Sequence, residues 1–184
     1  MNLPEESRVI AAVRNEDEFA AALQSPVSTI FDLSPELFSL KKRVETAHDA
    51  KKKLFIHLDL ALGIGKDRMG IRYAKEAGVD GIISTRVNII KTARELGLFT
   101  VQRVFIVDAH SVETTIDSAK ASKADMIEIM PGIVGKAILK MQERLDIPMI
   151  AGGLIETKEE AMQAITCGAA AVSTGKQELW RDLL

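Results

Sequence analysis

The sequence has 184 residues, of which 47% are hydrophobic and 27% are charged, and its formal net charge is -2. This profile is typical of an ordinary soluble protein, and it excludes one that holds nucleic acid through an overall basic field. The start, MNLPEESRVI, lacks the features of a signal peptide, and no run approaches the roughly 18 apolar residues of a membrane span, so we expect a cytoplasmic protein.

No stretch has the composition of a linker or of a low-complexity segment, so we expect a single domain over residues 1–184. Cys167 is the only cysteine, which excludes an intramolecular disulfide and a cysteine-based metal cluster. It lies between a helical pattern and an apolar run, where a small buried residue is the simplest interpretation. We expect no metal site.

Short apolar runs rich in Val, Ile, Leu and Phe recur along the chain, and amphipathic segments separate them. Such near-continuous runs are typical of strands that are buried on both faces of a parallel sheet. The expected strands are 9–13, 27–33, 54–60, 79–85, 99–108, 125–131, 147–153 and 170–175.

The segments between the runs carry helix start and stop signals. Asn15 is an expected N-cap, and Ser34 is another, with Pro35 at the first helical position. Three later segments end in a glycine suited to a left-handed helix terminus, namely Gly78, Gly97 and Gly168.

Eight strand–helix repeats of about 20 to 25 residues, closed by a short helix in QELWRDLL, predict a compact α/β fold, a (β/α)8 TIM-type barrel with short loops. An open doubly wound sheet is the alternative, because eight repeats in 184 residues fall below the usual barrel size of about 200 or more.

Glycines follow the last two apolar runs, in IAGGLIE and VSTGK. In a parallel barrel the loops after strands 7 and 8 often hold phosphate, since bare backbone N–H groups can approach its oxygens. We therefore expect a phosphate site made of Gly152, Gly153, Thr174, Gly175 and Lys176, although GG and TG are also compatible with simple tight turns.

Polar residues at the other strand ends could face the rest of a ligand. His57 and Asp59 are two residues apart in one expected strand, which would put them on the same side. Carboxylates can accept from vicinal hydroxyls, and arginine adds to phosphate neutralisation. The expected pocket residues are His57, Asp59, Arg86, Asp108 and Glu128, with Asp32, Ser84 and Thr85 nearby; a strand-end Asp such as Asp32 could instead cap the following helix.

Several phrases of the sequence resemble one family along nearly the whole chain. They are LFIHLDLALGIGKDRMGI, GVDGIISTR, ELGLFTVQRVFIVD, IEIMPGIV, IPMIAGGLIETKEEA and AVSTGKQELW. In this order they are similar to the glycerol uptake operon antiterminator regulatory proteins of low-GC Gram-positive bacteria. The resemblance implies a barrel that senses glycerol 3-phosphate, acts on leader mRNA of glycerol-catabolic genes, and is not an enzyme.

The chain departs from the family pattern at two places. Ala61 and Leu62 are apolar where the family often has a carboxylate, and Gly175 stands where it often has another hydroxyl residue. The first departure puts a metal or an extra hydroxyl contact in doubt, and the second shifts the expected phosphate contacts towards backbone and Lys176.

RNA contact is the least visible function in this sequence. Six basic residues fall in one expected helical segment and could neutralise RNA phosphates, although without the resemblance a solvated helix face is the favoured interpretation: Lys41, Lys42, Arg43, Lys51, Lys52 and Lys53. A small barrel enzyme for a phosphorylated polyol or sugar, with His57, Asp59, Asp108 or Glu128 as acid and base, stays open. A regulator that acts through a protein partner and a homo-oligomer also stay open.

Overall fold

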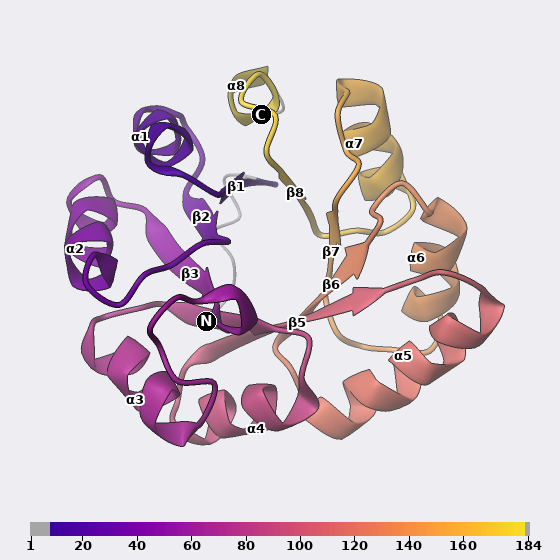
Figure 1. Ribbon diagram of the computed structural model, residues 1–184. Coiled ribbons are helices and arrows are strands. Elements are labelled where there is room, and N and C mark those ends of the chain that lie inside the picture. Colours follow the sequence, from indigo (N-terminus) through magenta and orange to yellow (C-terminus); the bar gives the residue numbers. More distant parts are fainter. Residues whose placement is uncertain (1–7, 183–184) are drawn as a thin grey trace.

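The computed structural model describes residues 8–182, and in it eight parallel strands close into a barrel (Figure 1). Each strand pairs with its sequence neighbours, and β1 pairs with β8, which closes the ring. The barrel prediction is confirmed, and the open sheet is excluded. The strands are β1 (Val9–Val13), β2 (Thr29–Asp32), β3 (Lys53–His57), β4 (Gly81–Ser84), β5 (Phe99–Phe105), β6 (Met126–Met130), β7 (Met149–Gly152) and β8 (Ala171–Thr174).

Helices surround the barrel on its outer side (Figure 1). They are α1 (Glu16–Gln24), α2 (Leu40–Asp49), α3 (Arg68–Glu76), α4 (Val87–Glu95), α5 (Ala109–Ser122), α6 (Gly135–Gln142), α7 (Lys158–Thr166) and the short α8 (Leu179–Asp182), with a 3-10 turn η1 (Leu58–Leu60) after β3. No helix of the described residues is long and apolar enough to cross a membrane.

Several helix boundaries follow the predicted signals. The Asn15 side chain accepts a hydrogen bond from the Glu18 backbone N–H at 2.8 Å and caps α1. Gly78, Gly97 and Gly168 have φ of 92°, 77° and 103°, the left-handed conformation that glycine tolerates best.

The segment after β2 does not follow the prediction. Ser34 caps no helix, because α2 begins only at Leu40. The Leu62 N–H donates to the Pro35 carbonyl and the Leu37 N–H donates to the Leu62 carbonyl, so the intervening chain is tied to the loop before α3. Asp32 accepts from the Ser34 N–H at 3.1 Å and forms a local turn instead.

Alternate residues of each strand divide between two apolar clusters. One cluster lies between the barrel and the helices, and it contains Val9, Ala11 and Val13 of β1. The other fills the barrel interior, where the inward residues are Ile10, Ala12, Phe31, Leu33, Phe55, Ile83, Val101, Met126, Ile150 and Ala171. This alternation decides which side chain lies inward at the carboxyl end of each strand.

Candidate functional site

A pocket of about 370 Å³ opens at the carboxyl ends of β1, β5, β6, β7 and β8. Such an edge is where ligand sites of parallel barrels lie. Its lining is Ala12, Arg14, Leu33, Arg103, Glu128, Met130, Gly153, Leu154, Ile155, Glu156, Ser173, Thr174, Gly175 and Lys176. The structure thus brings five predicted site residues together here, namely Gly153, Thr174, Gly175, Lys176 and Glu128.

Three buried polar side chains form one side of this pocket. Arg103, Glu128 and Ser173 each lie two residues beyond an inward apolar residue of their strand, so they face the interior too. Glu128 accepts from the Arg103 Nε at 2.6 Å and from the Ser173 hydroxyl at 2.6 Å. Both carboxylate oxygens are therefore engaged, and a buried ion pair is held in a hydrogen-bonded frame.

The two glycines of IAGGLIE have separate structural reasons. A Cβ on Gly152 would lie 2.6 Å from the Glu128 Oε1 and 2.6 Å from the Ser173 Oγ, so only glycine leaves room for that hydrogen bond. Gly153 has φ of 70°, and a Cβ there would lie 2.7 Å from the Met130 Cε. Gly152 leaves space for the hydrogen bond between Glu128 and Ser173, while Gly153 itself lines the pocket.

Thr174 and Lys176 have internal partners that the sequence did not reveal. The buried Thr174 hydroxyl donates to the Ile155 carbonyl at 2.8 Å and accepts from the Lys176 N–H at 3.1 Å. The Lys176 ammonium, about half exposed, pairs with Glu156 at 3.2 Å. These contacts shape the rim, and they leave Lys176 partly neutralised.

Arg14 is a lining residue that the sequence reasoning missed. It follows directly after β1, and one of its guanidinium nitrogens would lie 3.4 Å from a Cβ on Gly175. Within residues 8–182 its guanidinium has no ion-pair partner, whereas Arg103 is paired with Glu128. For Arg14, the available signal was its position directly after an apolar run. For Arg103, which was also missed, the signal was a charged residue within the apolar run 99–108.

His57 is the last residue of β3 and lies two residues beyond the inward Phe55. Its ring is buried, and its Nδ1 has no hydrogen-bond partner among the described residues. Burial, reinforced by the Arg103 guanidinium, lowers the pKa of His57 to about 4, against the opposing influence of Asp59 and Glu128. The imidazole is therefore neutral at physiological pH.

Asp59 does not lie on the same strand face as His57, so that prediction was wrong. β3 ends at His57, and Asp59 belongs to η1. Its carboxylate accepts from the Ser84 hydroxyl at 2.9 Å and from the Thr85 N–H and hydroxyl at 2.8 and 2.9 Å. Despite desolvation, these hydrogen bonds lower the pKa of Asp59. Arg86, more than half exposed, has its Nε 3.8 Å from Asp59.

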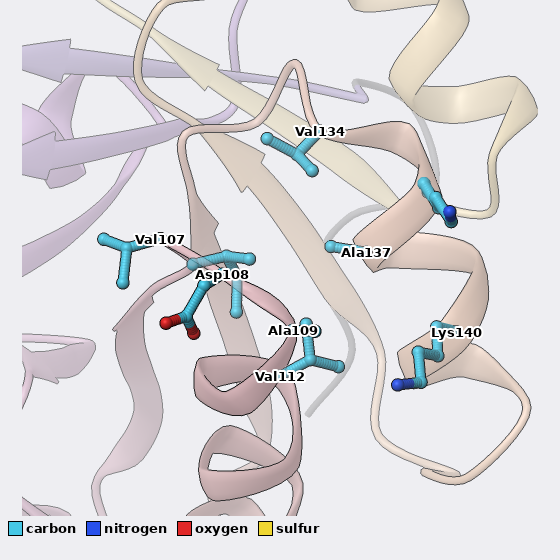
Figure 2. A pocket seen from close by; sticks show the side chains of 9 residues that line it. Val107, Asp108, Ala109, Val112, Val134, Ala137 and Lys140 are labelled. Atoms are coloured by element: carbon cyan, nitrogen blue, oxygen red, sulfur yellow. The ribbon is translucent and has the colours of Figure 1, made fainter.

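Asp108 lies outside the pocket, and its predicted place at the end of a strand was also wrong. β5 ends at Phe105, and Asp108 is the N-cap of α5. It accepts from the Ser111 N–H at 2.8 Å, in a reciprocal capping box that also lowers the pKa of Asp108. It lines a separate groove of about 490 Å³ between α5 and α6, which Figure 2 shows bordered by Val107, Val112, Val134 and Ala137.

The six basic residues proposed for RNA do not form one exposed helix. α2 ends at Asp49, Lys51 has a positive φ of 59°, and Lys53 begins β3. Arg43 is buried against Asp32, with 3.2 Å between the Nε and the carboxylate, and it stacks on Phe19. The buried Lys52 ammonium donates to the Ser25 and Val27 carbonyls at 2.7 and 2.6 Å, and burial lowers the pKa of Lys52. Lys41, Lys42 and Lys51 stay exposed.

Comparison with known proteins gives consistent matches over nearly the whole chain. The family model described as glycerol-3-phosphate responsive antiterminator matches residues 9–180. The uncharacterized protein YgcP of Escherichia coli K12 is 34% identical over 98% of this chain and 95% of its own. The crystal structure of a glycerol uptake operon antiterminator regulatory protein from Listeria monocytogenes shares 35% identity with a TM-score of 0.91, covering 98% of each chain. An antiterminator-related protein from Thermotoga maritima shares 29% identity with a TM-score of 0.85, covering 95% of this chain and 98% of its own.

Proposed function

The chain belongs to the family of glycerol-3-phosphate responsive antiterminators, and on that premise we propose that it binds glycerol 3-phosphate in the pocket at the carboxyl ends of its strands. In the bound state it acts in the cytoplasm on the leader mRNA of glycerol-catabolic genes. It senses the ligand and does not convert it.

The observation that carries this proposal is the combination of a free cation and a polar wall in one small pocket. Arg14 supplies a guanidinium without an ion-pair partner among the described residues, next to the glycine backbone at the ends of β7 and β8. A guanidinium and N–H groups suit the phosphate end of a ligand. Ser173 lines the same pocket, and its hydroxyl, which donates its proton to Glu128, has an oxygen that can accept from the hydroxyl end of the ligand.

Two of the four candidate acid–base residues, Glu128 and Asp59, have both carboxylate oxygens engaged, which supports sensing over catalysis. A general base needs an oxygen free to take a proton from the substrate. Both Glu128 oxygens are held by Arg103 and Ser173, and both Asp59 oxygens are held by Ser84 and Thr85. The Glu128 and Asp59 carboxylates are therefore arranged as fixed hydrogen-bond acceptors for neighbouring side chains.

Ligand and RNA must then be coupled through one equilibrium. If glycerol 3-phosphate favours the RNA-competent state, RNA must strengthen ligand binding by the same factor. A coupling of about 1 to 3 kcal/mol gives roughly 5- to 150-fold.

Calorimetric titration with glycerol 3-phosphate, glycerol and inorganic phosphate tests the pocket. The Arg14→Gln variant should bind glycerol 3-phosphate roughly 10- to 150-fold more weakly, because it loses a charge-assisted contact of about 1.5 to 3 kcal/mol. The matched control Lys176→Gln removes an exposed, already paired charge and should change affinity less than about 5-fold. Equal effects of the two variants would show that Arg14 does not hold the phosphate.

A second experiment tests the regulatory role. Binding of a synthetic leader RNA is measured with and without saturating glycerol 3-phosphate, and the ligand is followed by phosphorus NMR over hours. We expect RNA affinity to change with ligand while the phosphorus spectrum stays constant. An RNA affinity that is the same with and without ligand, or a product that accumulates, would contradict the proposed sensing function.

A further inference from the structure

Basic residues are concentrated on two consecutive helices that the sequence reasoning did not single out. Residues 66–95 hold seven Lys and Arg against four Asp and Glu, while the rest of the chain holds 17 against 22. This segment therefore carries +3 in a protein whose net charge is -2. The seven basic residues, all exposed, are Lys66, Arg68, Arg72, Lys75, Arg86, Lys91 and Arg94.

The two helices form one continuous surface. α3 and α4 pack against each other on the outside of the barrel and lie side by side in Figure 1. Arg68 of α3 reaches Glu95 of α4 at 2.9 Å, and the Lys75 ammonium donates to the Leu96 carbonyl at the end of α4 at 2.5 Å. We call the outer surface of these two helices, with the seven exposed basic residues, the α3–α4 face; at its border with α5, Arg94 donates to the Lys123 carbonyl.

Two of the four acids in this segment form no ion pair with its lysines or arginines among the described residues. Asp67 caps α3 by accepting from the Met69 and Gly70 N–H groups. Asp80 accepts from the Leu54 N–H of β3 and bonds the His48 ring of α2. Their carboxylates are committed elsewhere.

The other two acids pair with arginines and leave an excess of cations. Glu76 pairs with Arg72 at 2.9 Å, and Glu95 pairs with Arg68. These arginines stay 63% and 60% exposed, so the pairs are solvated and can exchange partners. Over the described part of the chain, four of the cations pair with no carboxylate: Lys66, Lys75, Lys91 and Arg94.

We infer that the α3–α4 face is the surface that contacts the sugar–phosphate backbone of leader RNA, an inference that rests on the proposed function. Guanidinium groups bind phosphate oxygens in a bidentate geometry, and uncompensated lysines release counterions when they neutralise phosphate. Tyr73 is half-buried, with its hydroxyl donating to the Leu37 carbonyl, so it does not offer a base-stacking ring. The face therefore holds phosphates, and it does not read bases by stacking.

Hydrogen bonds join this face to the segment that follows β3, which lies outside the lining of the pocket. Asp59 in η1 comes two residues after the buried His57, and it holds Ser84 and Thr85, directly before Arg86 and the start of α4. A shift of the carboxyl end of β3 on ligand binding would be passed to the first turn of α4.

The test compares two triple variants that remove the same charge from different helices. Lys75→Gln, Lys91→Gln and Arg94→Gln change the α3–α4 face, and Lys41→Gln, Lys42→Gln and Lys51→Gln change the region of α2. Each takes the net charge from -2 to -5, so long-range electrostatics are matched. The full-length proteins are titrated with a synthetic leader RNA that includes the terminator hairpin, at several salt concentrations with glycerol 3-phosphate present.

We expect only the α3–α4 variant to bind the leader RNA more weakly. Since each phosphate contact contributes about 0.7 to 0.9 to the salt slope, three lost contacts should reduce the slope by about 2 to 3 and weaken binding roughly 50- to 150-fold at about 0.15 M salt. Calorimetric affinity for glycerol 3-phosphate without RNA should stay unchanged, which shows that the variant is folded.

Three results would overturn the inference. If only the α2 variant binds RNA more weakly, the RNA-binding surface lies on α2. If both variants lose the same affinity, the effect is one of overall charge. Unchanged RNA affinity together with lost antitermination in a transcription assay would make the α3–α4 face a contact for a protein. Absence of RNA binding by the wild-type protein at every salt concentration would instead refute the proposed function itself.

Discussion

Acidification should destabilise this protein through the buried ring of His57. The buried ring has a pKa of about 4 in the folded protein, against 6.5 when exposed. The folded state therefore favours neutral imidazole by about 3 kcal/mol, while the unfolded chain takes up the proton freely. The contribution of His57 to the free energy of unfolding is fully present above pH 6.5. It is lost as the pH falls to about 4, where the folded and the unfolded state both bind the proton.

Urea unfolding between pH 7.5 and pH 4.5 measures this effect, and the His57→Gln variant is the control. Over that range the wild-type free energy of unfolding should fall by roughly 2 to 3 kcal/mol, and the variant, which cannot titrate there, should show a much flatter profile. The ring proton signals of His57, assigned by their absence in the variant, should not titrate above pH 5. A native His57 that titrates near 6.5 would show that the ring is solvated and would refute the argument.

Three further substitutions test the buried polar groups through thermal or urea unfolding. Gly152→Ala should cost about 2 kcal/mol, because its Cβ would lie 2.6 Å from both Glu128 and Ser173; a neutral result would mean that β7 shifts freely. Glu128→Gln should cost about 3 kcal/mol by leaving the Arg103 charge unpaired, and the double variant with Arg103→Met should recover part of that loss unless the pair is uncoupled. Lys52→Met should cost about 1 to 3 kcal/mol, since two buried carbonyls lose their donor, and unchanged stability would show that water replaces it.

Local sequence patterns predicted the fold because each part of the pattern is decided within a few residues. The apolar runs mark strands buried on both faces, and glycines at 78, 97 and 168 mark helix ends, whichever strands become neighbours. The eightfold repeat of the apolar runs made a barrel the expected closure. The glycines at the ends of β7 and β8 also predicted where the pocket would be, because the carboxyl ends of parallel strands meet at one edge.

The partner of each polar side chain was decided by the tertiary structure alone. Closure of the barrel brings Arg103 of β5, Glu128 of β6 and Ser173 of β8 into one cluster, although 25 residues separate the first two in sequence and 45 separate the last two. That cluster explains why Gly152 must lack a side chain, which no local pattern could show.

The same principle explains the failures of the sequence reasoning. Arg43 and Lys52 read as solvated cations, yet packing of α2 and β3 against the preceding strand and loop buries both beside oxygen acceptors. Asp59 leaves the strand because Ser84 and Thr85 of the next repeat offer it three hydrogen bonds. Hydrophobic periodicity determines where strands and helices form, while long-range hydrogen bonds and ion pairs exist only once the chain has closed.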